Sequence, residues 1–405
     1  RPVRTDRGGA SVGAYLDDVG DDEPGESGIP DDTAPAVDPQ ERLLLATVRA
    51  CLENAAVRAD RLAAAGPVGV FTGAMWHDHA RGRDTAPDGT AAVPTGTGLA
   101  HRVSHVFDFS GPSLVVDSGC ASGLAAVEAA VRSLRTGQCT AAVAAGANLV
   151  LDPSHLEFLA QAGLLAESAD SRPFSDRSDG WIPGEGIGAV LLKPLARALA
   201  DGDPVHAVVR GGACRHSGRT RDYGMPGPER LEETVRAALA DAGLSVDAIG
   251  YVETSATGAA LNDALELDVL GRVFGDRPRP LPVGSVKGVL GHMEAASGFG
   301  QLARVLAQFR RGRLLPTPVP DTGGDGTLAG GGGRVRLVRA EEDAHPPRRV
   351  LVNSFAGTGG YVSLVVEAPP PRTTAPAPDG PVTLPLSADT PTELTRYALR
   401  LAAFL

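Results

Sequence analysis

The sequence predicts an α/β protein that consists of two similar halves. Short apolar runs of strand length alternate with amphipathic segments of roughly ten residues or more, which is typical of parallel sheets covered by helices. Residues 38–55 place apolar side chains on one helical face, and residues 68–74 follow as a buried strand. The same alternation begins again at residue 205. We therefore expect an internal duplication.

The other strands are predicted from short apolar runs, and the other helices from amphipathic or Ala- and Leu-rich spacing. The strands lie at 112–116, 141–151, 205–213, 249–256, 281–288, 334–340, 348–355 and 361–368. The helices lie at 121–134, 228–244, 265–274 and 296–312. A glycine-rich tip at 321–333 precedes the last three strands.

Changes in composition divide the chain into three parts. Residues 1–37 are rich in Gly, Pro and Asp, which predicts a flexible, solvated acidic arm. Residues 38–368 are predicted to form the folded domain, with halves at about 38–200 and 201–368. Residues 369–405 begin as a Pro-rich linker and end in an amphipathic helix that stops in mid-pattern. We expect the natural polypeptide to continue beyond it.

The composition excludes several classes of function. The 405-residue chain carries a formal net charge of -11, whereas nucleic-acid binding needs a clustered basic surface. No apolar run approaches the roughly 20 residues that span a bilayer, and the N-terminal residues lack the apolar centre of a signal peptide. The four cysteines lack CxxC spacing, so neither a metal site nor a disulfide framework is indicated. We expect a soluble cytoplasmic protein with no nucleic-acid or membrane partner.

Cys120 has the sequence context of a nucleophile. A buried strand enters a tight Gly119-Cys120 turn, and a helix begins immediately after it. The helix N-terminus favours a thiolate, and nearby backbone N–H groups can stabilise an oxyanion. The alternative is a buried cysteine that acts as a small apolar side chain, the commonest role of a free cysteine. Cys51, Cys139 and Cys214 look structural by the same criteria.

Five motifs, in order, resemble the β-ketoacyl synthase domains of modular polyketide synthases. They are the segment around Cys120 and residues 171–211, 251–271, 284–306 and 352–360. The resemblance begins at about Asp38 and covers nearly all of the chain that follows. Family domains open with a strand and a helix that precede anything seen here, so the N-terminus looks truncated or diverged.

The resemblance implies a thiolase-like fold of two stacked halves, layered α-β-α-β-α. It also implies a homodimer that receives acyl chains from an acyl carrier protein. The acyl chain travels on the phosphopantetheine arm of the carrier, and no cofactor is bound directly by the ketosynthase.

Four site residues follow from the resemblance. Cys120 is the implied nucleophile, His292 the second of two family histidines, and Lys287 the family lysine. The first histidine is absent. Ser255 stands where the family motif E-A-H-G-T-G-T has it.

The resemblance also implies an oxyanion hole and a substrate pocket. The backbone N–H groups of Cys120 and Gly357 form the oxyanion hole, and Gly357 occupies the position of a gating phenylalanine in the family. The substrate pocket is expected to include Gly119, Phe355 and Thr257. Glycine at positions 119 and 357 predicts extra space beside the sulfur.

Ser255 argues against the ordinary decarboxylative condensation of the family. A serine hydroxyl cannot become cationic and is a poor acid or base near neutral pH. Loss of one well-placed donor to a developing oxyanion typically costs about 10²–10³ in rate. Malonyl decarboxylation is therefore expected to be slow.

Two other reactions need Cys120 but no malonyl group. One is transfer of an acyl chain between carrier proteins. The other is cyclisation, in which His292 removes an acidic proton from the tethered chain and the carbanion attacks a second carbonyl, with lactone formation as one route of release. A carrier-docking scaffold is the non-enzymatic alternative. We favour cyclisation, because a chain that folds back on itself needs the space that the glycines leave.

Several polar residues also have a structural interpretation. His292 could be a core histidine, although its motif and Lys287 favour chemistry. Asp263 and Glu294 fit family positions and are expected to be scaffolding. His155 and the remaining histidines are expected to be structural or surface groups, including the pair at 77 and 79, which lacks a third metal-binding partner.

Overall fold

The computed structural model describes most of the chain, in separate stretches. These divide into two compact units, residues 1–369 and residues 370–405. Most of the glycine-rich tip expected at 321–333 lies outside the described residues. The described residues are 3–4, 10–17, 19, 29, 37–80, 96–319, 332–342, 347–371, 383–388 and 390–404.

The first sheet of residues 1–369 has four strands in the order β4-β3-β5-β6. Strand β3 runs parallel to β4 and β5, and β6 runs antiparallel to β5. Every residue of β3 and β5 is buried, as expected for apolar runs in the centre of a sheet. The strands are β3 (Val68–Gly73), β4 (Ser113–Val116), β5 (Ala141–Asn148) and β6 (Gly186–Leu192).

The second sheet has six strands in the order β10-β9-β8-β11-β12-β7. Strands β10, β9, β8 and β11 are parallel, whereas β12 runs antiparallel to both β11 and β7. The expectation of wholly parallel sheets is therefore wrong. A short turn joins β11 to β12, and only antiparallel strands can be joined so tightly. The strands are β7 (Val208–His216), β8 (Tyr251–Glu253), β9 (Leu281–Gly284), β10 (Val335–Leu337), β11 (Arg349–Phe355) and β12 (Gly360–Glu367).

The two sheets repeat one arrangement, as the predicted duplication requires. The order β4-β3-β5-β6 in the first sheet corresponds to β9-β8-β11-β12 in the second, and the last strand of each series is antiparallel. Each sheet thus presents the C-terminal ends of its parallel strands at one edge. This is where polar loops of α/β folds gather.

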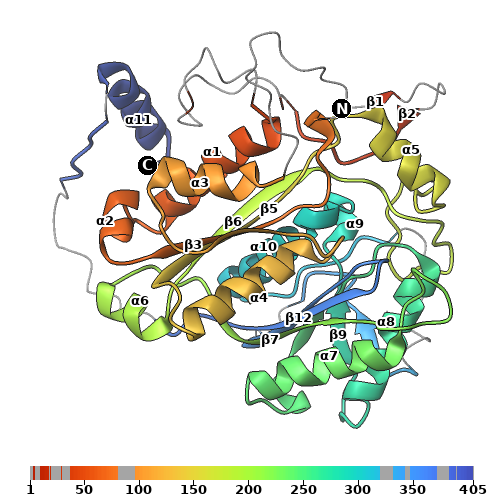
Figure 1. Ribbon diagram of the computed structural model, residues 1–405. Coiled ribbons are helices and arrows are strands. Elements are labelled where there is room, and N and C mark those ends of the chain that lie inside the picture. Colours follow the sequence, from red (N-terminus) through yellow and green to blue (C-terminus); the bar gives the residue numbers. More distant parts are fainter. Residues whose placement is uncertain are drawn as a thin grey trace. The chain divides into compact units, whose positions relative to one another are not determined.

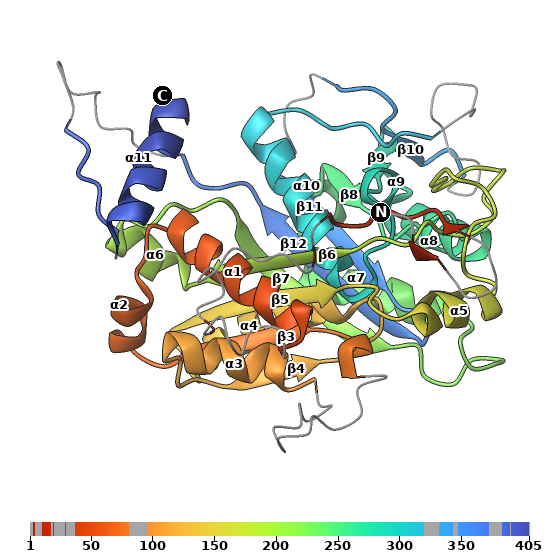
Figure 2. The ribbon, with the colours of Figure 1, turned by 90° about the horizontal axis from the view of Figure 1, so that it is seen from above.

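Helices cover both sheets and fill the space between them, which confirms the α-β-α-β-α layering (Figures 1 and 2). Helices α1 and α3 pack on the outer face of the first sheet, and α7 and α8 cover the second. Helices α4 and α10 form the central layer and contact both sheets. These helices are α1 (Pro39–Asn54), α3 (Gly98–Phe107), α4 (Ser122–Arg135), α7 (Pro228–Asp241), α8 (Ala260–Phe274) and α10 (Ser297–Arg311).

Glycines bring the two central helices into close contact. A Cβ atom added to Gly123 of α4 would lie 2.7 Å from the carbonyl oxygen of Ala295, just before α10. A Cβ atom added to Gly298 of α10 would lie 2.9 Å from the backbone nitrogen of Leu124. No larger side chain fits at either position without moving the backbone. This contact places the start of α4 beside the start of α10.

Several elements were not anticipated from the sequence. They are short, or lie in motifs whose apolar periodicity is weak. They comprise α2 (Ala59–Ala64), α5 (Pro153–Gln161), α6 (Leu195–Asp201), α9 (Lys287–Leu290) and three 3₁₀ turns at Asp78–Ala80, Val246–Ala248 and Glu294–Ala296, besides α3 and β6.

Part of the expected N-terminal arm belongs to the folded domain. Strands β1 (Val3–Arg4) and β2 (Ala10–Ser11) pair with each other. The backbone N–H of Ala14 donates to the carbonyl of Pro183 at 2.9 Å, and the carbonyl of Ala14 accepts from Glu185 at 2.9 Å. The expectation of a wholly solvated arm is therefore wrong for this stretch, because its backbone pairs with the segment before β6.

Residues 370–405 contain one described helix, α11 (Pro391–Phe404). It matches the amphipathic helix predicted there, and none of its described residues is buried. Across the described stretches, no helix has the length and apolar character needed to cross a membrane.

Candidate active site

The turn that carries Cys120 is fixed by local hydrogen bonds. Strand β4 ends at Val116, and α4 begins at Ser122. The Ser122 hydroxyl accepts from the backbone N–H of Ser118 at 2.8 Å and donates to the carbonyl of Gly119 at 2.6 Å. Gly119 has a φ of 58°, in the left-handed region that favours glycine. The sequence therefore needs glycine before the cysteine to form this turn.

Gly119 does not enlarge the pocket, contrary to expectation. A Cβ atom at this position would lie 3.0 Å from the Cβ atom of Ala356 and 3.1 Å from the Thr358 hydroxyl. The missing side chain lets the loop after β11 approach the cysteine turn. Gly119 therefore contributes to packing between the halves rather than to free volume.

Gly357 does leave space. A Cβ atom added to it would meet no other atom within 4 Å. The loop that contains it is closed by hydrogen bonds between Ala356 and Gly360 at 2.8 Å and between Gly359 and Ala356 at 2.9 Å. The position of a side chain at residue 357 is therefore open space.

Cys120 is half-buried, and its thiol is protonated at neutral pH. Burial raises the pKa of the Cys120 thiol to about 12, and the negative charge of Glu294 acts in the same direction. Lys287 and the backbone N–H groups of Cys120 and Gly357 lower the pKa but do not outweigh burial. Burial thus opposes the thiolate that the helix N-terminus is expected to favour. The same two N–H groups are the expected oxyanion donors, and both lie close enough to stabilise charge on the sulfur.

His292 is held by hydrogen bonds to Ile182 and to Ser297 at the start of α10. Its backbone N–H donates to the carbonyl of Ile182 at 2.7 Å, and its Nδ1 atom lies 2.9 Å from the hydroxyl of Ser297, the first residue of α10. The indole of Trp181 packs edge-on against the imidazole, with ring centroids 4.7 Å apart. Burial, and then the charge of Lys287, hold the pKa of His292 well below its usual value. The imidazole is therefore neutral at pH 7 and can accept a proton.

Ser255 and Lys287 are in direct contact. The Lys287 Nζ atom donates to the Ser255 carbonyl oxygen at 2.5 Å and lies 3.3 Å from its hydroxyl oxygen. The backbone N–H of Phe355 donates to the same hydroxyl at 3.0 Å. The backbone N–H of Ser255 is bound by both carboxylate oxygens of Glu266, at 3.1 and 3.0 Å. The serine is thus fixed at both backbone and side chain.

Phe355 and Thr257 are engaged in packing and turn formation. The Phe355 ring packs edge-on against Tyr361, with centroids 5.5 Å apart, at the margin of the core of the second half. The Thr257 hydroxyl accepts from the backbone N–H of Ala259 at 3.2 Å, and the backbone N–H of Thr257 donates to Asp263 at 2.9 Å. Both side chains thus also make contacts within the second half of the fold. That they line the substrate pocket stays a prediction.

The structure thus brings Cys120, Ser255, Lys287 and His292 to one region between the halves. The Ser354 hydroxyl donates to the Cys120 carbonyl at 3.2 Å, and the next residue, Phe355, binds Ser255. Strand β11 therefore links the cysteine turn of the first half to the serine of the second.

Sequence reasoning missed a buried charge network next to this region. The two ring nitrogens of His155 lie 3.0 Å from a carboxylate oxygen of Asp78 and 2.8 Å from one of Glu294. Glu294 also accepts from the Trp76 indole N–H at 2.8 Å. Burial alone lowers the pKa of His155, but the hydrogen bonds to Asp78 and Glu294 raise it to about 9. His155 is therefore an imidazolium that offsets the charge of two carboxylates.

These contacts agree with the structural roles expected of His155 and Glu294. Glu294 has a φ of 39°, a positive value that a residue other than glycine rarely adopts, and it lies two residues after His292. His155 was expected to be structural or a surface group, and it is fully buried. The only sign of this network in the sequence was the run of Trp, His and Asp at 76–79. These residues do not form a metal site. Among the described residues, no three His, Cys, Asp or Glu side chains are arranged to hold a metal ion.

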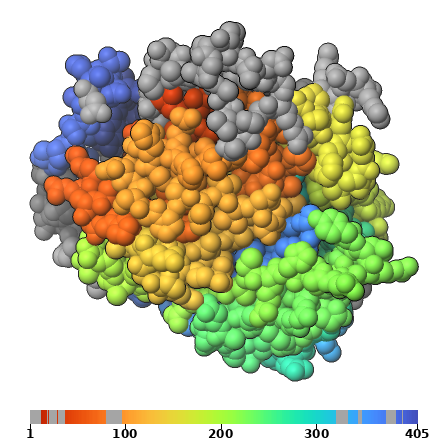
Figure 3. All heavy atoms as spheres, in the orientation of Figure 1, coloured from red at the N-terminus to blue at the C-terminus, as the bar shows by residue number. Residues whose placement is uncertain are grey.

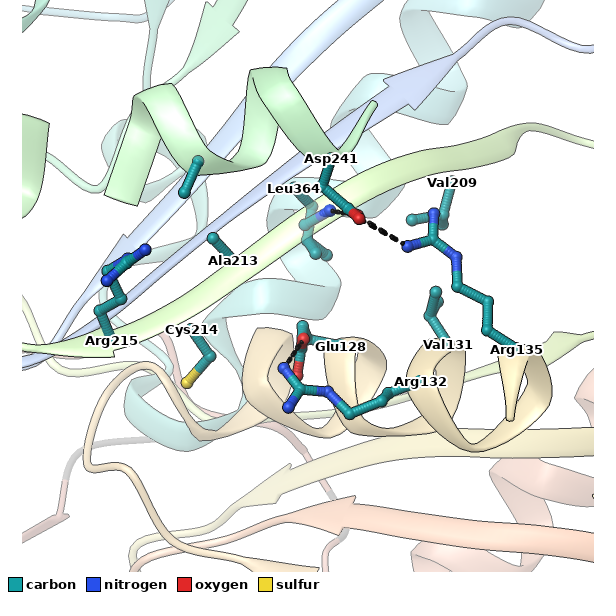
Figure 4. Close-up of a pocket in the computed structure, with 12 residues that line it drawn as sticks. Glu128, Val131, Arg132, Arg135, Val209, Ala213, Cys214, Arg215, Asp241 and Leu364 are labelled. Atoms are coloured by element: carbon teal, nitrogen blue, oxygen red, sulfur yellow. Dashed lines mark hydrogen bonds and ion pairs between the residues drawn. The ribbon is translucent and has the colours of Figure 1, made fainter. Parts of the chain in front are cut away.

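A surface cavity of about 440 Å³ lies elsewhere, between α4, β7 and α7. Figure 3 shows the face on which the gold surface around α4 meets the green surface around α7. Two ion pairs flank the cavity, Arg132 with Glu128 and Arg135 with Asp241, and the exposed Cys214 lines it (Figure 4). None of the expected site residues lines it. It belongs to the far end of α4, away from Cys120, and is not the acyl site.

Two family profiles match most of the chain. "Beta-ketoacyl synthase, N-terminal domain" matches residues 2–198, and "Beta-ketoacyl synthase, C-terminal domain" matches residues 206–319.

Curated relatives are polyketide synthases. The chain is 37% identical to polyketide synthase PksR of Bacillus subtilis (strain 168), over 81% of the chain and 14% of the relative. It is 38% identical to polyketide synthase ThaQ of Burkholderia thailandensis, over 97% of the chain and 19% of the relative. It is 34% identical to erythronolide synthase EryA2 of Saccharopolyspora erythraea, over 97% of the chain and 11% of the relative. The chain thus spans less than a fifth of the length of each.

Solved ketosynthase domains share the fold. The oxazolomycin ketosynthase domain OzmH KS7 of Streptomyces albus JA3453 matches with a TM-score of 0.88 and 34% identity, over 97% of this chain and 70% of that domain chain. The ketosynthase from module 6 of the bacillaene synthase of Bacillus subtilis 168 matches with a TM-score of 0.81 and 25% identity, over 96% and 67%. The predicted thiolase-like fold is confirmed.

The His155 imidazolium predicts that stability falls above neutral pH. A group whose pKa is higher in the folded protein stabilises the fold fully below its unfolded pKa, near 6.5, and loses that contribution as the pH rises through about 9. Urea unfolding should therefore show a decline of up to about 3 kcal/mol between pH 6 and pH 10 that His155→Gln lacks. The variant should be less stable at pH 6, because Asp78 and Glu294 lose their shared counter-ion. Parallel pH profiles of the two proteins would show that His155 is not charged in the fold.

Proposed function

Because the chain belongs to the β-ketoacyl synthase family, we propose that it takes an acyl chain from an acyl carrier protein onto Cys120 and closes that chain into a ring without malonyl decarboxylation. The observation that carries this proposal is the environment of Ser255. At the position of the family histidine, the hydroxyl is bound to Lys287 and to the Phe355 N–H, and it supplies no imidazole. The chain keeps Cys120 for acyl capture, but it lacks the family histidine that would assist decarboxylation.

Acyl capture is the first step of the proposed mechanism. The carrier presents the acyl thioester on its phosphopantetheine arm, and no other cofactor is required. The Cys120 thiol loses its proton as the sulfur attacks the carbonyl carbon, and the carrier thiol leaves with a proton. The N–H groups of Cys120 and Gly357 are the proposed donors to the oxyanion of the intermediate.

Ring closure uses His292 as the proposed base. The neutral imidazole can remove a proton from an acidic carbon of the tethered chain, and the carbanion attacks a second carbonyl in the same chain. The oxygen of that carbonyl then takes the proton back from His292, which leaves a hydroxyl group and a neutral imidazole. The hydrogen bonds of the described residues engage Nδ1 of His292, which leaves Nε2 for the substrate. The open position at Gly357 supports this step, since the folded acyl chain needs volume next to the sulfur.

Transfer between carrier proteins is the second candidate reaction. It needs only Cys120 and the oxyanion donors, all of which lie together here. It gives no reason for the open position at Gly357, because a chain that is only passed on does not fold back. We therefore rank cyclisation first, and ordinary decarboxylative condensation last.

We also propose that the chain acts as a homodimer. Strand β4 is an end strand of the first sheet as described, and its Leu114 side chain is 51% exposed. An exposed end strand with an apolar residue favours pairing with a second chain. This arrangement would place the cysteine turn, which follows β4, close to the interface.

Decarboxylation provides a direct test of the missing histidine. Carbon dioxide release from malonyl carrier protein should be slow with the natural Ser255, and Ser255→His should accelerate it by about 10–100-fold, because an imidazole restores a donor to the enolate oxygen. Ser255→Ala is the matched control and should remain as slow as the natural protein. Rapid release by the natural protein would return ordinary condensation to first place.

Ring formation tests the cyclase assignment. Protein acylated on Cys120 with a chain that contains an internal carbonyl and an acidic carbon should form a ring with no malonyl partner. Intramolecular attack can gain roughly 7–11 kcal/mol over a bimolecular step when the geometry is ideal. His292→Ala should load the chain normally and stall, with the linear acyl group still attached to the protein. If the chain instead reaches a second carrier unchanged, at equal rates in both proteins, transacylation is the correct function.

A further inference from the structure

The hydroxyl of Ser255 has a hydrogen with one suitable acceptor nearby. Ser255 is 6% exposed, and the backbone N–H of Phe355 donates to its hydroxyl oxygen at 3.0 Å. A backbone N–H can only donate, so this bond leaves the hydroxyl hydrogen free. Among the described residues, the other polar neighbour of the oxygen is Nζ of Lys287, at 3.3 Å. A neutral amine there would accept that hydrogen.

Lys287 is placed where a neutral amine is favoured. It is 1% exposed, and no carboxylate of a described residue lies within ion-pair distance of it. Burial lowers the pKa of Lys287, and the ionised forms of Cys120 and Glu266 would oppose that shift. A neutral amine has two hydrogens and one lone pair. One hydrogen can bind the Ser255 carbonyl at 2.5 Å while the lone pair faces the hydroxyl.

The contrast with the other lysine supports this interpretation. The chain contains two lysines among its 38 Lys and Arg residues. Lys193 forms ion pairs with Asp201 at 2.6 Å and with Asp203 at 2.5 Å, as a structural cation does. Arginine cannot give up its proton in a protein, whereas lysine can. Lys287 therefore has a side chain that can act as a base and an environment that favours its neutral form.

The serine and the cysteine both contact the end of β11. Two consecutive residues of β11 bind the two nucleophiles, since the Ser354 hydroxyl contacts the Cys120 carbonyl at 3.2 Å and the Phe355 N–H contacts the Ser255 hydroxyl. We propose that Ser255 and Lys287 form a serine–lysine nucleophilic pair, and that Ser255 is a second acyl acceptor that receives the chain from Cys120.

The step balances without any further reagent. Lys287 accepts the hydroxyl proton of Ser255 as the oxygen attacks the thioester carbonyl on Cys120. The carbon–sulfur bond breaks, the sulfur leaves, and it recovers the proton from Lys287. A thioester and an alcohol become a thiol and an ester, with no oxidation or reduction. This second acceptor rests on the proposed capture of the acyl chain by Cys120, and it extends the site from one nucleophile to two.

A small alkyl fluorophosphonate provides the test, because it forms a stable bond with activated serines and needs no carrier protein. The experiment uses Cys120→Ala, so that the thiol does not compete, and maps the modified peptide by mass spectrometry. Ser255 should be modified, and Ser255→Ala in the same background should abolish the signal. The labelling rate should rise with pH and level off below the usual lysine pKa of 10.5, in line with the lowered pKa of Lys287.

Lysine variants separate a reactive pair from a packed hydroxyl. Lys287→Met and Lys287→Arg should each lower the labelling rate by about 100-fold, because neither side chain can accept the proton. Arginine keeps a cation and hydrogen-bond donors, so it controls for a loss of structure. Lys193→Met is the matched control and should label at the unmodified rate.

Two outcomes would overturn the pair. One is that Ser255 in Cys120→Ala takes no label although the protein with its natural Cys120 captures acyl groups. Acyl capture by the natural protein shows that reagents can reach the site. The other is equal labelling with Lys287→Arg. Labelling of Ser255 in a protein whose Cys120 captures no acyl chain would instead refute the proposed function and leave the pair standing.

Discussion

The close contact between α4 and α10 is the constraint on which the site depends. Gly123 and Gly298 let the two helices approach until backbone atoms of each nearly touch the other. The first turns of both helices therefore meet, and these turns follow Cys120 in one half and His292 in the other. Larger residues at the glycines would separate the two halves of the site. The geometry of the chemistry is thus set by packing in the central layer.

Burial between the halves shifts the pKa of each reactive group toward its neutral form. It raises the pKa of the Cys120 thiol and lowers those of His292 and Lys287, so each favours its neutral form. Charge appears in this region during reaction, when a proton moves from one group to another. Next to the site, the positive charge of His155 is paired with the carboxylates of Asp78 and Glu294.

The sequence predicted most strands and long helices, because their apolar periodicity records which face is buried. It also located the Cys120 turn, since a strand, a glycine and a helix follow each other within one segment. It could not reveal the His155 network, whose members are separated by 77 and 139 residues. For the same reason it gave Gly119 the wrong role: the atoms that fill its space come from Ala356 and Thr358. The contact of Ser255 with Lys287 likewise depends on how the second sheet places two distant loops.

Every step of the account requires Cys120 to be the first acyl acceptor, and time-resolved mass spectrometry of the intact protein and its peptides tests this most directly. With an acyl carrier thioester as donor, the first adduct should appear on the Cys120 peptide. Cys120→Ala should lose this early capture, and Cys214→Ala, which removes an exposed thiol from the surface cavity, should keep it. A first adduct on another residue, or capture by Cys120→Ala at the natural rate, would contradict the account.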